Sequence, residues 1–569
     1  MDSSFALTAL SLSISAALAA WAAPKAARRL QLSRAKHRSL AGHSRMAKRL
    51  ASWLPGYALR EDDFFGADGA DEALRQQRRG ALQRLALHFK DRVPNGVAMT
   101  QAAKTLLADL AFTSRYRVPF QFTDEMAQAL QTSSFIQSSR GPVLRDVDGQ
   151  EWIDVSGSYG VNVLGYETYK RCIEEAVVRA GELGPVLGAY HPCVLENAQR
   201  LARISGLDQV SFHMSGTEAV MQAVRLARYH TGRQHLVRFC GAYHGWWEDV
   251  QPGPGNPAAP RETYTLKDMD ERSLSVLRSH RNIACVLINP LQALHPNAPA
   301  PGDSSLVDSG RRAQYDRAAY TAWLKRLREV CTQRGILLIF DEVFLGFRLA
   351  PGGAQEYFGV KADMVTYGKT LGGGLPVGVV CGKADLMQRF RTQRPADICF
   401  ARGTFNAHPY VMAAMKAFLD RMEQPSVLAL YQGLDERWNA RRDALNERLA
   451  AQQLPVRVAN MSTVWTVLYE RPSRYNWLLQ FYLRKHGLWL SWVGSGRMIF
   501  SLDFTEVAYE EVAQRFVAAA AEMQADGWWS GPVLSNRDIR RRIFKEMWGW
   551  RPASNTASTQ APPPVMDLR

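Results

Sequence analysis

The chain of 569 residues has few cysteines, and none of them are paired at a spacing typical of a metal site. Its seven cysteines lie far apart and include no CxxC motif. An odd, dispersed set of this kind is typical of reduced, buried thiols and argues against a disulfide framework. We therefore predict free thiols and no metal site. Internal repeats are also absent, which excludes a repeat architecture.

Acidic residues are absent between Pro24 and Arg60, where lysine and arginine recur, and the net charge of the chain is +16. A second basic cluster runs from Arg537 to Lys545. Basic stretches can bind nucleic acid, but next to an apolar segment they more often meet anionic lipid head groups. We expect these segments to contact a membrane and not nucleic acid.

Long uncharged apolar runs are rare, and residues 5–23, rich in Ala, Leu and Ser, form one. Its length suits a marginal membrane span. Asp2 precedes the run and the basic residues follow it, which is the reverse of a signal peptide. We predict a transmembrane anchor over residues 1–23 and, by the positive-inside rule, a membrane-anchored protein whose catalytic part is cytoplasmic. An amphipathic or simply buried alanine-rich helix is the alternative.

Residues 24–120 are basic and helical in pattern, with Leu82, Leu85 and Phe89 at helical spacing. We expect a membrane-proximal helical region there. Farther along, the alternation of apolar and polar residues on both sides of Asp148-Gly149 predicts a β-hairpin.

The middle of the chain has the pattern of an α/β fold. Between about residues 190 and 400, helical patterns alternate with short apolar strands, which implies a mostly parallel sheet covered by helices. We expect a large domain at 190–405. A smaller α+β domain is then formed by residues 121–189 and 406–548. The tail 549–569 is rich in Pro, Ser and Thr and is predicted to be disordered.

Two motifs place charged residues at strand ends. In G-I-L-L-I-F-D-E-V (335–343) a buried strand ends in Asp341-Glu342, at the carboxyl edge where open α/β sheets bind ligands. In Y-G-K-T-L-G-G-G-L-P-V-G (367–378) Lys369 follows another strand and precedes a glycine run. A lysine in that setting has little structural purpose, so we predict a chemical role.

Two further motifs lie upstream. In H-M-S-G-T-E-A-V (213–220), Ser215, Gly216 and Thr217 stand at a helix N-terminus, which favours a phosphate, although a simple N-cap is the alternative. In C-G-A-Y-H-G (240–245), Tyr243 and His244 follow the next strand. An aromatic ring there can stack on a planar heterocycle, and ordinary packing is equally compatible with the pattern.

Five motifs in this order resemble those of the class III aminotransferases, and within them the glutamate-1-semialdehyde aminomutase-like branch. The resemblance covers roughly residues 120–525 and rests on S-G-T-E-A, Y-H-G, F-D-E-V-F-L-G-F-R, G-K-T-L-G-G-G-L-P-V-G and G-T-F-N-A-H-P. It implies the pyridoxal 5′-phosphate (PLP)-dependent aminotransferase fold type I, with PLP as the cofactor.

The resemblance also implies roles for single residues. Lys369 would form the Schiff base with PLP and then act as general base, and Asp341 would pair with the pyridinium nitrogen. Thr404 would reach the phosphate of the neighbouring subunit, which implies a homodimer with shared sites. The remaining residues expected around the cofactor are Ser215, Gly216 and Thr217 at the phosphate, Tyr243 and Val343 on the two ring faces, His244 beside Tyr243, and Gln292 near the phenolic oxygen.

The sequence departs from the family pattern at several positions. Asn289 stands where the family usually has a glutamate, Tyr166 where it has a histidine, and His408 where the aminomutases commonly have an asparagine. These differences weaken any transfer of the glutamate-semialdehyde substrate. A second group of residues has either a substrate contact or ordinary packing and ion pairing as its predicted role: Trp246, Trp247, Arg348, Arg402 and His408.

The leading functional hypothesis is an aminotransferase that moves an amino group from an amine or amino-acid donor to an aldehyde or ketone acceptor, which could be hydrophobic or delivered at a membrane. An intramolecular 2,1-aminomutase acting on an amino aldehyde would use the same residues. A PLP-dependent decarboxylase or carbon–carbon bond-forming enzyme is the third alternative. The need for a second substrate separates the transferase from the mutase.

Overall fold

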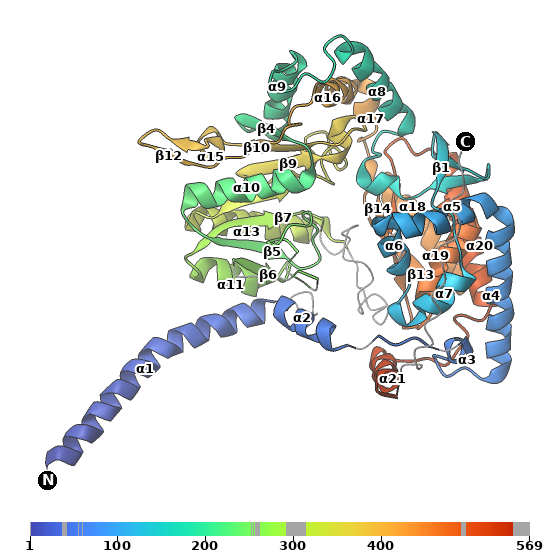
Figure 1. Ribbon diagram of the computed structural model, residues 1–569, viewed down its shortest axis with the longest axis horizontal. Helices are drawn as coiled ribbons and strands as arrows, with labels where there is room; N and C mark the ends of the chain where they lie inside the picture. The colour runs from blue at the N-terminus through green and yellow to red at the C-terminus, as the bar shows by residue number, and fades with distance from the viewer. Residues whose placement is uncertain are drawn as a thin grey trace.

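The computed structural model describes residues 2–36, 43–54, 56–59, 61–251, 253, 255–256, 262–291, 315–490 and 497–549. Figure 1 shows two lobes, one around the largest sheet and one in which N-terminal and C-terminal segments lie together, and helix α1 (Asp2–Ala35) extends away from both. Gln292 and the predicted disordered tail beyond residue 549 lie outside the described residues.

The first lobe contains a seven-stranded sheet in the order β4-β10-β9-β8-β7-β5-β6. Strand β10 runs antiparallel to both of its neighbours, whereas the other adjacent pairs are parallel. The predicted α/β class with a mostly parallel sheet is therefore confirmed. The strands are β4 (Gln209–His213), β5 (His235–Phe239), β6 (Thr263–Leu266), β7 (Ile283–Ile288), β8 (Leu337–Asp341), β9 (Met364–Gly368) and β10 (Gly378–Gly382).

Helices cover this sheet. Helix α10 (Gly216–Thr231) lies along β10, β9 and β7, and α13 (Arg317–Arg334) packs against β8 and α11 (Glu271–Ser279). Strands β7, β9 and β10 are buried throughout, which explains their continuous apolar sequences. Because parallel strands end at the same edge, the residues that follow β4, β5, β7, β8 and β9 come together there.

The second lobe contains two smaller sheets, β1-β2-β3-β15 and β13-β14-β16. The hairpin predicted at Asp148-Gly149 is confirmed, since β2 (Val143–Asp146) pairs antiparallel with β3 (Glu151–Asp154). Strand β15 (Leu488–Trp489) pairs with β3 and so joins segments far apart in the sequence. We propose that both sheets belong to one smaller domain with the predicted boundaries 121–189 and 406–548. The other strands are β1 (Ile136–Arg140), β13 (Val456–Met461), β14 (Val464–Tyr469) and β16 (Arg497–Ile499).

The remaining elements connect and cover the lobes. Helices α8 (Tyr166–Ala180), α9 (Cys193–Ser205) and α16 (Pro409–Met422) pack together at one end of the molecule (Figure 1). The others are α2 (Ser44–Trp53), α3 (Glu61–Phe65), α5 (Pro94–Leu106), α6 (Ala108–Arg115), α7 (Thr123–Ala129), α14 (Gly353–Phe358), α15 (Ala384–Met387), α17 (Pro425–Ala429), α18 (Leu434–Ala451), α20 (Glu506–Ala525), α21 (Asn536–Gly549) and the short strands β11 (Phe390–Arg391) and β12 (Arg394–Ile398).

The N-terminal helix α4 (Glu72–Arg92) is integrated into the second lobe. It buries the predicted apolar face of Leu82, Leu85 and Phe89 and packs against α19 (Leu479–Lys485). The Arg78 guanidinium at the same helix is fully buried and forms two hydrogen bonds with Asp68, of 2.9 and 2.7 Å. The helical character predicted for this part of the region is thus confirmed.

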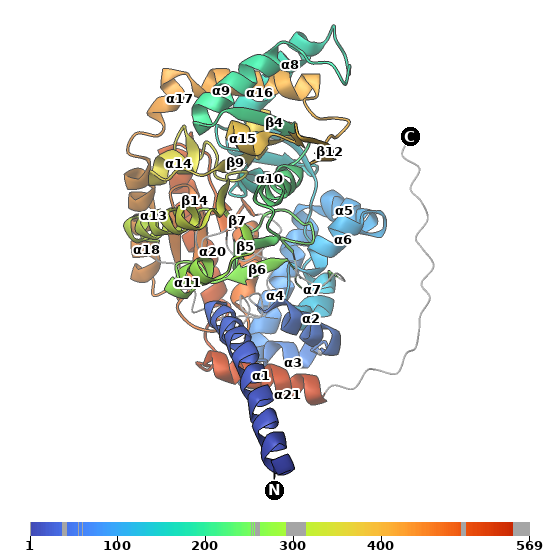
Figure 2. The same cartoon turned by 90° about the vertical axis from the view of Figure 1, so that its left-hand side faces the viewer.

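The predicted membrane anchor over residues 1–23 is wrong. Among the described residues, no helix combines the length and the apolar character that crossing a membrane requires. Alanine and serine, whose small side chains gain little free energy in hydrocarbon, are frequent in the run, and α1 continues from it into the basic segment. Its C-terminal part lies beside α11 of the first lobe (Figure 2), where Gln31 donates a 2.8 Å hydrogen bond to Ser275. The predicted membrane partner, the membrane-proximal role and the membrane-anchored location with a cytoplasmic catalytic part are corrected with it.

Candidate active site

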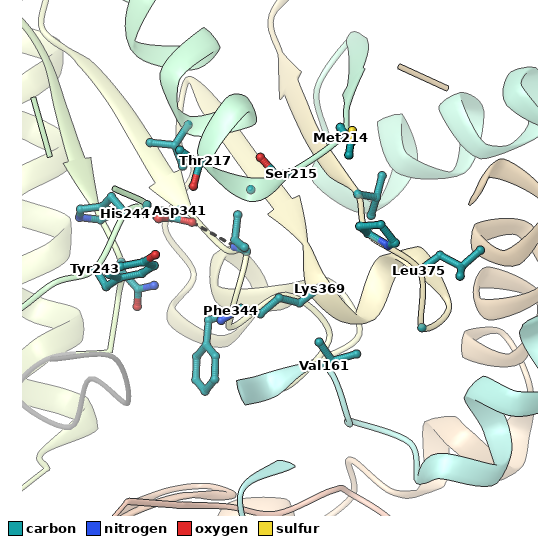
Figure 3. Close-up of a pocket in the computed structure, with 18 residues that line it drawn as sticks. Val161, Met214, Ser215, Thr217, Tyr243, His244, Asp341, Phe344, Lys369 and Leu375 are labelled. Atoms are coloured by element: carbon teal, nitrogen blue, oxygen red, sulfur yellow. Dashed lines mark hydrogen bonds and ion pairs between the residues drawn. The ribbon is translucent and has the colours of Figure 1, made fainter. Parts of the chain in front are cut away.

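A cavity of about 460 Å³ lies at the carboxyl edge of the seven-stranded sheet. Residues that follow β4, β5, β7, β8 and β9 line it, as the parallel topology requires. Figure 3 shows Ser215, His244, Asp341 and Lys369 around the same space, although they come from four different segments. Val161, from the second lobe, completes the wall.

Lys369 follows β9 directly, at the start of the short helix η5 (Lys369–Gly372). Its φ of +47° is uncommon for a non-glycine residue and is maintained by the packing around it. Burial lowers the pKa of the Lys369 amine to about 8, while the Asp341 carboxylate raises it and the Arg348 guanidinium lowers it further. A lysine with this pKa is partly neutral near pH 7 and is therefore a competent nucleophile.

Asp341 and His244 form a buried pair beside Lys369. The Asp341 Oδ2 atom lies 2.7 Å from His244 Nδ1, and both side chains are almost completely enclosed. Since a carboxylate only accepts hydrogen bonds, Nδ1 carries the proton. The other oxygen, Oδ1, accepts from the Val343 backbone N–H at 3.1 Å and from the Thr366 hydroxyl at 3.3 Å. These contacts fix the orientation of the carboxylate.

Helix α10 begins at the cavity. Ser215 is its N-cap and accepts a 3.2 Å hydrogen bond from the Glu218 backbone N–H. The free N–H groups of the first turn and the helix dipole make this end a suitable site for a phosphate. Gly216 is required because a Cβ atom there would lie 2.6 Å from Val343 Cγ1.

The cavity fits PLP in its polar groups. The buried atoms His244 Nε2 and Asn289 Oδ1 both lack a hydrogen-bond partner among the described residues, and both residues line the cavity. Buried polar atoms normally have a hydrogen-bond partner, so we expect these two atoms to bind polar groups of a ligand. Tyr243 and Val343 line the cavity as well, and burial together with the Asp341 charge raises the pKa of the Tyr243 hydroxyl.

Most of the residues predicted from the motifs lie together, and their individual roles stay predictions. Thr404 does not line the cavity and is exposed, and Gln292 lies outside the described residues. The predicted residues that line the cavity are Ser215, Gly216, Thr217, Tyr243, His244, Asp341, Val343 and Lys369.

The sequence reasoning missed several apolar residues of the wall. Val161, Met214, Phe344 and Leu375 all line the cavity. Met214, Phe344 and Leu375 lie within the quoted motifs, but no periodicity distinguishes an apolar side chain that faces a cavity from one that packs in the core.

The residues predicted to serve either as substrate contacts or in packing and ion pairing do not line the cavity: Trp246, Trp247, Arg348, Arg402 and His408. Arg348 is fully buried and donates hydrogen bonds to Thr463 Oγ1 at 3.0 Å and to the backbone oxygen atoms of Phe500, Gly160 and Asn162. This network identifies it as a structural residue and not as a surface ion pair. Trp246 is exposed, and Trp247 packs against the core of the first lobe. Arg402 is exposed, and His408 is the N-cap of α16.

Comparison with known proteins shows similarity over most of this architecture. The family model described as "Aminotransferase class-III" matches residues 126–248 and 316–519. The chain is 33% identical over 353 residues to a glutamate-1-semialdehyde 2,1-aminomutase of Desulfotalea psychrophila (strain LSv54 / DSM 12343), which spans 59% of this chain and 76% of that protein.

Two solved structures are similar as well. The β-phenylalanine aminotransferase from Variovorax paradoxus superposes with a TM-score of 0.62 at 25% identity, over 79% of this chain and 98% of that chain. A transaminase with PLP bound superposes with a TM-score of 0.58 at 26% identity, over 74% of this chain and 99% of that chain.

Proposed function

The chain belongs to the class-III aminotransferases, with the PLP-dependent fold type I and PLP as cofactor, and on this basis we propose that it transfers an amino group to or from an apolar small molecule. The family supplies the enzyme class. The choice of a transferase with an apolar substrate is our proposal from the cavity itself.

The observation that carries the proposal is the composition of the cavity wall. Val161, Met214, Phe344 and Leu375 present apolar side chains, and apart from Lys369 no lysine or arginine is found among the described lining residues. A substrate carboxylate or phosphate far from the reacting carbon would meet no cation among these described lining residues. An aliphatic or aromatic amine or carbonyl compound would instead gain from contact with this wall.

The proposed roles follow from the positions of the side chains. When bound, PLP supplies an electron sink that stabilises the charge left on the carbon beside the amino group. Lys369 would bind the aldehyde group of the cofactor. Its amine, once released, would move a proton between the substrate carbon that bears the amino group and the aldehyde carbon of the cofactor. Asp341, oriented by His244 and Thr366, would hold a proton on the pyridine nitrogen. The α10 N-terminus would hold the phosphate.

We also propose a homodimer in which Thr404 of each subunit completes the other's phosphate site. Thr404 is exposed and lies between the exposed aromatic side chains Phe400 and Phe405. An exposed apolar pair beside a polar residue suits an interface better than a solvated loop. Thr404→Val should weaken PLP retention, while the mass of the protein in solution should remain that of a dimer.

An intramolecular aminomutase is the second candidate, because relatives such as that of Desulfotalea psychrophila carry this name. The same Lys369 and Asp341 would serve it. Asn289, where the family usually has a glutamate, and the apolar side chains of the cavity wall favour the transferase.

An absorbance titration tests the proposal. The purified protein, loaded with PLP, is mixed with candidate amine donors in the absence of any acceptor. Loss of the visible band with an apolar amine, and its recovery with an apolar aldehyde or ketone, would support the transferase. A protein that turns over an amino aldehyde without any donor would be a mutase. Lys369→Ala is the control, because it should lack the visible band of the cofactor–lysine adduct.

A further inference from the structure

Four consecutive residues beside the cavity have left-handed backbone angles. The φ values are +55° at Gly157, +45° at Ser158, +56° at Tyr159 and +94° at Gly160. Glycine tolerates such angles, but serine and tyrosine do not adopt them without cost. A turn of this kind persists only where its surroundings hold it, and such strain is concentrated at functional sites.

A hydrogen-bond network holds the first half of the turn. The Tyr166 hydroxyl lies 2.6 Å from the buried Asp154 Oδ2 and 2.7 Å from Ser158 Oγ. The Ser156 hydroxyl donates to Asp154 Oδ1 at 2.6 Å and accepts from the Ser158 backbone N–H at 3.3 Å. Tyr166 stands where the family usually has a histidine, so in this chain the tyrosine hydroxyl links the turn to Asp154.

The second half of the turn presses against Phe344. A Cβ atom at Gly160 would lie 2.3 Å from Phe344 Cε2 and 2.4 Å from Cδ2. Arg348 holds the same part of the backbone by hydrogen bonds to the carbonyl groups of Gly160 at 3.3 Å and Asn162 at 3.1 Å. Glycine is therefore required at position 160 for two reasons: its backbone angle, and the Phe344 ring, which occupies the space that a Cβ atom would need.

Phe344 in turn lies against Lys369. The Lys369 Nζ atom is 4.8 Å from the centroid of the Phe344 ring, which is 3% exposed and lines the cavity. Figure 3 shows the ring below the lysine side chain, on the side away from α10. Neither the motif nor the proposed chemistry assigns this phenylalanine a role.

We propose that Phe344, fixed by the left-handed turn at residues 157–160, is a positioning residue that holds the Lys369 amine at the reacting end of the cavity. The proposal rests on the proposed role of Lys369. Its consequence is that a turn from the second lobe controls the amine of the first lobe, through one ring.

The groups that face the amine determine the sign of the expected effects. Asp341, paired with His244, favours the charged amine, whereas Arg348 and burial disfavour it. The face of an aromatic ring favours the cation. Leucine in place of Phe344 keeps an apolar wall and removes the ring, so the amine should become easier to deprotonate. Alanine should let water in and have the opposite effect.

The experiment uses the full chain freed of cofactor. The rate of PLP capture, followed by its visible absorbance, is measured against pH, and the midpoint of the profile reports the pKa of the Lys369 amine. For Phe344→Leu we expect the midpoint to fall by about half a unit, and for Phe344→Ala we expect it to rise. Lys369→Ala should capture no PLP in this form. If it does, the proposed role of Lys369 fails, independently of Phe344.

Gly160→Ala tests the turn, and Gly141→Ala is its matched control. Gly141 also has a positive φ, of +55°, but a Cβ atom there would meet nothing within 4 Å. We expect Gly160→Ala to slow capture about tenfold or more and Gly141→Ala to leave it unchanged. Phe344→Leu carries the test where Gly160→Ala does not fold. Unchanged midpoints in both Phe344 variants would overturn the proposal and leave Phe344 as a plain part of the wall.

Discussion

The buried amine of Lys369 should make the stability of the cofactor-free protein depend on pH. Its pKa falls from 10.5 to about 8 on folding. Between these values the folded protein binds fewer protons than the unfolded chain, so this residue raises the free energy of unfolding as the pH rises. Below about pH 8 both states are protonated, and the full cost of burying the charge is present.

The magnitude follows from the size of the shift. At about 1.4 kcal/mol for each pH unit, a shift of this size corresponds to about 3 kcal/mol. Because Lys369 lines a cavity that admits water, we regard this figure as an upper bound. Lys369→Met has a similar length and no charge. Near pH 7 the methionine variant should therefore be more stable than the natural chain by up to about 3 kcal/mol.

Urea unfolding of both proteins without cofactor, followed by tryptophan fluorescence at several values between about pH 7 and 10.5, measures the difference. The gap should close as the pH rises, whereas any gain from added apolar contact would persist at every pH. Lys90→Met, which removes an exposed lysine from α4, is the matched control, and its effect should not vary over this range. A pH-independent gap for Lys369→Met would refute the reasoning.

Three further predictions concern the site and the N-terminal helices. Asp341→Asn should lower kcat by on the order of a hundredfold or more, because the neutral amide cannot hold the pyridine nitrogen protonated. Leu375→Ala should lower KM for a bulkier apolar amine without lowering kcat, and a lower kcat would contradict its place in the wall. Arg78→Leu leaves Asp68 buried without its partner and should cost about 3–5 kcal/mol. Urea unfolding measures this cost, and Asp68→Asn in the same chain should recover part of it.

The site illustrates what local sequence can and cannot predict. Asp341, Lys369 and the segment Ser215–Thr217 were identified because each follows an apolar strand, and parallel strands bring their carboxyl ends to one edge. Thr404 was identified only by the resemblance; it is exposed in the single chain, and its role stays a prediction. The membrane span predicted from residues 5–23 is wrong, because length and lack of charge do not make a helix sufficiently apolar when alanine and serine are frequent in it.

The sequence by itself determined the alternation of helices and strands in the middle of the chain, because apolar periodicity is a short-range pattern. The ordered motifs, through their resemblance to the class III aminotransferases, indicated the cofactor. Only the tertiary structure decided which neutral side chains face the cavity, that Arg348 is a buried structural residue, and that His244 fixes Asp341. It alone brought Gly160 against Phe344 and Phe344 against Lys369. The contact between Gly160 and Phe344 joins residues about 180 positions apart in different lobes, and no local pattern records a contact made by chain packing.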